Sequence, residues 1–98
     1  MGSRCIVVNV RHDAFDVYVG RAGRGYDGYF GNPFVIGKDG NRAEVIERFR
    51  GWFERKLATD PTYRARVLAL RGKRLGCFCA PAACHGHVIA EWVNKQEP

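Results

Sequence analysis

The first twenty residues contain two short segments whose hydrophobic positions are typical of β-strands. Cys5–Val10 is apolar and rich in β-branched side chains. Phe15–Val19 alternates, so that its apolar side chains share one face. The link Arg11–Ala14 is short enough for a β-hairpin, and the two strands can equally lie apart in one sheet. The pattern predicts two strands and leaves their pairing open.

From Asn41 onward the hydrophobic residues recur at helical spacing. Asp39 or Asn41 can cap this helix, and Glu44 lies in its first turn, where a carboxylate is favoured. Thr59–Pro61 ends it and starts a second helix that reaches about Leu70, with proline at its first position. The apolar stripe of the first helix consists of Val45, Ile46, Phe49, Trp52, Phe53 and Leu57.

The last third of the chain predicts one more strand and one more helix. Lys73–Cys79 alternates, with Leu75, Cys77 and Cys79 on one face, and the helix runs from about Cys84 to Lys95. The order β-β-α-α-β-α predicts one α/β domain over residues 1–98. We expect a small sandwich with a three- or four-stranded sheet and about three helices.

The segment Gly20–Pro33 fits neither pattern. It contains five glycines, two arginines and two tyrosines, and no aliphatic side chain larger than that of alanine. It is therefore a long loop, and loops of this length in a small domain are usually functional or disordered. Its aromatic and arginine content favours a functional loop.

Charge and composition narrow the class of protein. The net charge is +6, and twelve of the sixteen basic residues are arginine, which favours anionic partners such as a nucleotide or a nucleic acid. No segment approaches the roughly 18 apolar residues of a membrane span, so we expect no membrane partner and a cytoplasmic location. In a cytoplasmic protein, four cysteines indicate free thiols, metal ligands or a redox pair rather than a disulfide framework.

Most of the reactive side chains gather between Gly76 and Ile89, which hold three of the four cysteines and two of the three histidines. Cys84 falls at the start of the last helix, where unpaired N–H groups and the helix dipole lower the pKa of a thiol. The sequence therefore makes Cys84 the candidate nucleophile and His85 the candidate acid or base.

Three other interpretations of this cluster remain open. Cys77, Cys79 and Cys84, with either His85 or His87, supply enough ligands for tetrahedral zinc, although their spacing is unlike that of the usual paired knuckles. Cys79 and Cys84 can act as a dithiol across the turn. Cys77, like Cys5 on the first strand, can also be a small apolar core residue.

Five motifs occur in order along the chain: Val8-Asn9, Asp16–Arg21, Gly31–Phe34, Leu75–Pro81 and Cys84–Gly86. With these motifs the chain resembles the small bacterial and bacteriophage proteins catalogued as domain-of-unknown-function family forty-three twenty-six. The resemblance covers nearly the whole chain, and no established activity comes with it. The chain departs from the family pattern at Ala22–Tyr29, which is longer here, and at Phe30, which stands where a tryptophan is usual.

Two segments contain residues that packing in a hydrophobic core does not explain, namely the glycine-rich loop and the Cys84-His85 turn. We hypothesise that these two segments face each other across one pocket. Arg21 would bind an anionic group, Asn32 would orient it, and the backbone N–H groups of Gly86 and His87 would hold another oxygen.

Two classes of function follow from this arrangement. The first is an enzyme or binding domain that acts on a nucleotide or a nucleic-acid-derived ligand. The second is a non-catalytic basic module that binds a host protein or a nucleic acid, with a structural, zinc-holding cluster.

Overall fold

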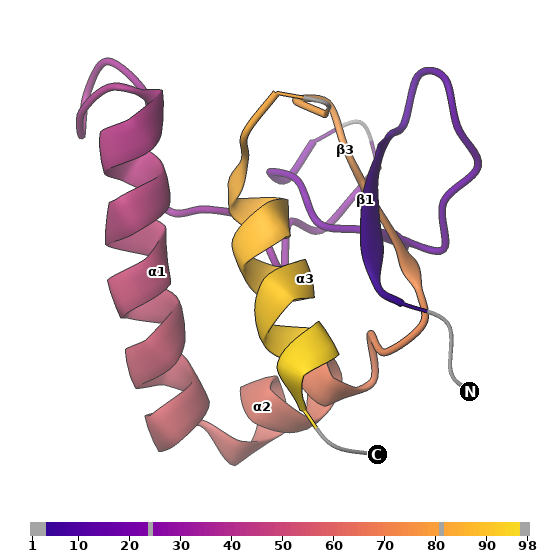
Figure 1. The fold of residues 1–98 in the computed structure, drawn as a ribbon. Coiled ribbons are helices and arrows are strands. Elements are labelled where there is room, and N and C mark those ends of the chain that lie inside the picture. Colours follow the sequence, from indigo (N-terminus) through magenta and orange to yellow (C-terminus); the bar gives the residue numbers. More distant parts are fainter. Residues whose placement is uncertain (1–3, 24, 81, 97–98) are drawn as a thin grey trace.

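The computed structural model describes residues 4–23, 25–80 and 82–96. Three strands and three helices follow one another in the predicted order (Figure 1). They are β1 (Ile6–Asn9), β2 (Val17–Tyr18), α1 (Arg42–Thr59), α2 (Pro61–Leu68), β3 (Arg74–Cys77) and α3 (His85–Lys95). The small α/β domain predicted from the sequence is confirmed, with three strands in the sheet.

The sheet is parallel throughout and has the strand order β1-β3-β2. Leu75 of β3 lies opposite Val7 on one side and opposite Val17 on the other. The first two strands are therefore not a hairpin, because the last strand to appear in the sequence separates them. This is the second of the two pairings that the sequence left open.

Helix α3 is the central helix of the domain. It contacts β1 and β3 on one side and α1 and α2 on the other, and Figure 1 shows it between the sheet and α1. Its buried side chains Val88, Ile89 and Val93 join Leu75 in the core. At its far end the Asn94 side chain accepts from the Cys5 N–H at 2.8 Å and donates to the Cys5 carbonyl at 2.9 Å.

The two remaining helices begin at the caps that the sequence provides. Asn41 accepts from the Glu44 N–H, and the Glu44 side chain accepts from the Asn41 N–H, which forms a capping box. Asp39, the other candidate cap, instead accepts from the Val35 N–H. Asp60 caps α2 through the Tyr63 N–H.

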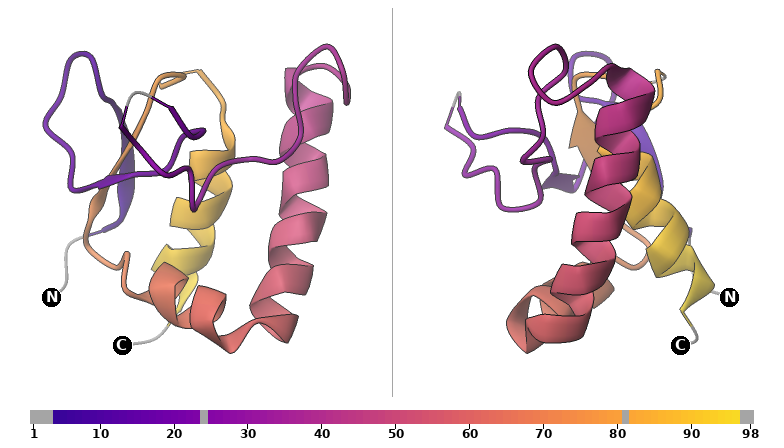
Figure 2. Two further views of the ribbon diagram at one scale, coloured as in Figure 1. Left: turned by 180° about the vertical axis from the view of Figure 1, so that it is seen from behind. Right: turned by 90° about the vertical axis from the view of Figure 1, so that its left-hand side faces the viewer.

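The amino ends of α1 and α3 lie at the same end of the molecule as the carboxyl end of β3 (Figures 1 and 2). Open α/β folds bind their ligands outside the carboxyl ends of their strands.

Among the described residues, no helix has both the length and the apolar character that a membrane crossing requires.

The face of β3 opposite α3 is covered by the segment that links β1 to β2. A Cβ added at Gly76 would stand 2.6 Å from the Phe15 ring and 2.7 Å from Val10 Cγ1. Such distances are well inside van der Waals contact, so the link can lie on the sheet only because residue 76 has no side chain.

Replacing Gly76 with alanine is therefore expected to destabilise the fold by roughly 1–3 kcal/mol, as overpacking does in well-packed cores. Gly51→Ala is the matched control. It lies inside α1, its Cβ would meet only the flexible end of Arg55 at 3.3 Å, and alanine is the better helix former by up to about 1 kcal/mol. Urea unfolding should move the two midpoints in opposite directions, and a neutral Gly76→Ala would contradict the close packing described here.

Candidate functional site

A cavity of about 220 Å³ lies at the carboxyl ends of β2 and β3, between the amino ends of α1 and α3. Both segments that the sequence assigned to one pocket contribute to it. Its wall consists of Tyr18, Gly20, Arg21, Asn32, Ile36, Arg42, Val45, Ile46, Cys77, Phe78, Cys79, Ala83, Cys84 and His85.

A hydrogen bond from His85 links the start of the glycine-rich loop to the start of α3. Its Nε2 lies 2.6 Å from the carbonyl oxygen of Val19. Since a carbonyl oxygen only accepts, Nε2 carries the proton. Burial lowers the pKa of His85, against the opposite effect of the Val19 and Phe30 carbonyls. The His85 side chain is thus a buried imidazole, and its neutral form is favoured. Its role as an acid or base remains a prediction.

Arg21 and Asn32 hold the loop together. The Arg21 guanidinium donates to the carbonyl oxygens of Asn32 and Phe34. The buried Asn32 donates to the Val45 carbonyl of α1 at 3.2 Å and accepts from the Phe34 N–H at 2.9 Å. A guanidinium has five N–H bonds, so Arg21, which is exposed, keeps donors for a ligand.

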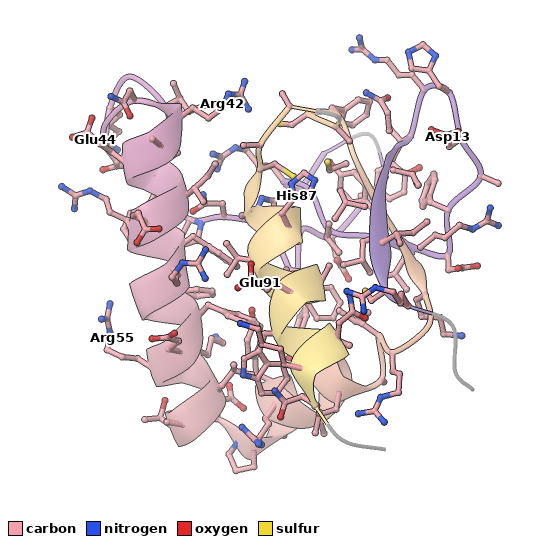
Figure 3. All side chains as sticks on the ribbon, viewed as in Figure 1. Asp13, Arg42, Glu44, Arg55, His87 and Glu91 are labelled. Atoms are coloured by element: carbon pink, nitrogen blue, oxygen red, sulfur yellow. The ribbon has the colours of Figure 1, made fainter. Side chains whose placement is uncertain are left out.

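Arg42 is a cavity residue that the sequence reasoning missed. It is the first residue of α1, and its Nη1 donates to the Ala83 carbonyl in the turn before α3 at 2.9 Å. Figure 3 shows it at the same end of the molecule as His87. A signal was available in the sequence, because a cation at the amino end of a helix opposes the helix dipole.

The arginines that line the cavity give it a positive charge. Arg21 and Arg42 line it, and the lining residues include no aspartate or glutamate. Within the described part of the chain, neither arginine forms an ion pair with a carboxylate. The positive charge of Arg21 also contributes to lowering the pKa of His85.

Cys77 and Cys84 form a thiol pair on that wall. Both are buried, and their sulfurs lie 3.4 Å apart. The hydrogen bond from Cys84 lowers the pKa of Cys77 to about 6, helped by the backbone N–H groups of Ala80 and Cys79 and opposed by burial. The same hydrogen bond, together with burial, raises the pKa of Cys84. The hydrogen bond therefore favours a state in which the two sulfurs share one proton.

The role of Cys84 as the thiolate nucleophile remains a prediction. The helix start provides N–H groups to Cys84 from Gly86 and His87, which lower the pKa of Cys84, while hydrogen bonding to Cys77 and burial raise it. The anion site at Gly86 and His87 likewise remains a prediction, and the N–H groups of both residues face the Cys84 sulfur outside the set of residues that line the cavity.

His87 is exposed and lies beside the thiol pair. Its Nδ1 accepts from the Cys84 N–H at 3.2 Å and is 3.6 Å from the Cys84 sulfur. With the backbone N–H donating to Nδ1, the neutral ring carries its proton on Nε2. Nδ1 is therefore placed to accept a proton from the Cys84 thiol.

Cys79 does not complete a metal set with these residues. Strand β3 ends at Cys77, so the alternation that placed Cys77 and Cys79 on one face stops there, and Cys79 is exposed. Asn9 holds this turn, donating to the carbonyls of Phe78 and Ala80 at 3.3 and 2.7 Å. In residues 4–23, 25–80 and 82–96, no three or more His, Cys, Asp or Glu side chains are grouped to hold a metal ion.

These features define a small α/β domain with a cationic, thiol-bearing cavity at the carboxyl edge of a parallel sheet. The chain belongs to the family described as Domain of unknown function (DUF4326), whose model matches residues 8–95. A relative from Enterobacteria phage T4, described as an uncharacterized 12.4 kDa protein in the nrdA-td intergenic region, is 40% identical over 96 residues. The match spans 97% of this chain and 82% of the phage protein. No solved structure matches the chain.

The thiol pair predicts a specific effect of substituting Cys84. Alanine removes the S–H group that stabilises the Cys77 thiolate, so the pKa of Cys77 should rise from about 6 toward the ordinary value of about 8.5. Serine keeps a hydroxyl donor and should leave the pKa closer to the parent value.

The measurement is thiolate absorbance against pH, with Cys5 and Cys79 replaced by serine so that they do not titrate. The parent should then gain its first thiolate near pH 6, and the alanine variant only at clearly higher pH. Equal midpoints in the parent and the alanine variant would show that the hydrogen bond is not the cause.

Proposed function

We propose that this protein binds a phosphate-bearing ligand of mononucleotide size in the cavity at the carboxyl edge of its sheet. One observation carries the proposal. Arg21 and Arg42 approach the cavity from the loop and from α1, and no carboxylate in the described residues neutralises either of them. Paired guanidinium groups are well suited to phosphate oxygens.

The remaining wall supports a ligand with a flat apolar part. Tyr18 and Phe78 lie edge to face with ring centroids 6.1 Å apart, and Val45 and Ile46 of α1 line another part of the cavity. An aromatic and aliphatic wall beside two arginines is what a nucleobase joined to a phosphate would contact.

The size of the cavity argues against a long polymer inside it. Its volume of about 220 Å³ lies below the roughly 300–1,000 Å³ of pockets that enclose drug-sized ligands. One nucleotide, with part of it outside the cavity, is therefore the largest unit that it accommodates. We also propose a cytoplasmic location, where nucleotides are available and thiols stay reduced.

The test is calorimetric titration of the reduced protein with nucleoside 5′-monophosphates, the matching nucleosides and inorganic phosphate. We expect a monophosphate to bind more tightly than either of its parts. Arg21→Gln and Arg42→Gln should each weaken binding by roughly tenfold or more, because each removes a charge-assisted hydrogen bond.

Arg55→Gln is the matched control. It removes the same charge from the same helix as Arg42→Gln, but Arg55 does not line the cavity, and Figure 3 shows it farther along α1 than Arg42. Equal losses in the Arg42 and Arg55 variants would indicate attraction by net charge alone. Binding that appears only with oligonucleotides and falls steeply with salt would favour the basic-module alternative.

A further inference from the structure

The two sulfurs of the thiol pair are held in position by different parts of the fold. Cys77 is the last residue of β3, and Cys84 is the N-cap of α3. Backbone N–H groups of Cys79 and Ala80 face the first sulfur, and those of Gly86 and His87 face the second. The separation of 3.4 Å between the sulfurs is therefore fixed by the strand, the turn and the helix together.

Both cysteines line the cavity and are nevertheless almost fully covered, with exposed fractions of 2% for Cys77 and 4% for Cys84. A folded protein carrying a disulfide cannot reach sulfurs at this depth. A small molecule that enters the cavity can.

We propose that Cys77 and Cys84 are a redox-active dithiol that reduces a small peroxide entering the cavity. This activity goes beyond ligand binding and needs no nucleotide. It differs from the dithiol that the sequence suggested, which paired Cys84 with the exposed Cys79.

In the first step the Cys77 thiolate attacks one oxygen of the peroxide ROOH, and the O–O bond breaks. The distal oxygen becomes the hydroxyl of a sulfenic acid on Cys77, and RO⁻ leaves and takes a proton from water to give ROH. Cys77 is thereby oxidised by two electrons, and the peroxide is reduced.

In the second step Cys84 attacks the sulfur of the sulfenic acid. The S–O bond breaks, and the hydroxyl leaves as water with the proton of the Cys84 thiol, which passes through Nδ1 of His87 at 3.6 Å. The balance is two thiols and ROOH giving one disulfide, ROH and water. The sulfurs need to approach by only about 1.4 Å to reach the roughly 2.05 Å of an S–S bond.

The other two cysteines provide comparisons within the same chain. Cys79 is exposed. Cys5 is buried at the opposite end of the sheet, where burial raises its pKa to about 11. Neither has a second sulfur beside it among the described residues, so neither should take part in the disulfide.

The experiment adds one equivalent of hydrogen peroxide to the reduced full-length protein in the absence of air. We expect the free thiols to fall from four to two, with peptide mapping by mass spectrometry locating the disulfide at Cys77 and Cys84. Cys5→Ala, which changes a cysteine that does not line the cavity, should react as the parent does. Retention of all four thiols, or a disulfide that includes Cys79 or Cys5, would overturn the proposal.

Two further variants separate the steps. Cys84→Ser should stop at a sulfenic acid on Cys77, trapped by a carbon nucleophile such as dimedone, and Cys77→Ser should lose the reaction. Circular dichroism checks that each variant is folded. A folded Cys77→Ser protein that consumes peroxide at the parent rate would also overturn the proposal, whether or not the nucleotide titration succeeds.

Discussion

The rest of the structure depends on the two-sided burial of the central strand. Leu75 and Cys77 face α3, while Gly76 between them leaves room for Phe15 on the other side. This single strand pairs with both of the others, in parallel. Its end therefore fixes where the two neighbouring strands end and where the last helix begins, and the cavity lies at that edge.

The polar side chains around the cavity stabilise the loop that forms part of its wall. His85, Asn32 and Arg42 each bond to a backbone carbonyl of another segment, and Arg21 bonds to a carbonyl of its own loop. A loop so rich in glycine has a large conformational entropy to lose, and these bonds offset part of that cost. The residues that would meet a ligand are thus already positioned before it arrives, which lowers the cost of ordering on binding.

Local sequence patterns predicted the elements well and their spatial relations less well. The helical stripe from Val45 to Leu57 and the cap at Asn41 follow from short-range periodicity and hydrogen bonding. The parallel pairing of β1 and β2 with β3 does not, because it joins partners such as Ile6 and Arg74, or Val17 and Leu75, that are far apart in the sequence. The sequence placed Cys77 and Cys79 on one face of a strand, but β3 ends at Cys77. The 3.4 Å contact between Cys77 and Cys84 joins a strand end to a helix start, and no local pattern predicts it.

The double hydrogen bond between Asn94 and Cys5 joins the start of the first strand to the end of the last helix, at the edge of the sheet remote from the cavity. A short peptide linker bridging that contact would make the domain a closed ring of chain. Such a ring could be cut at a surface turn to give a circular permutant whose new ends lie elsewhere, with the order of strands in the sheet and the composition of the cavity wall unchanged.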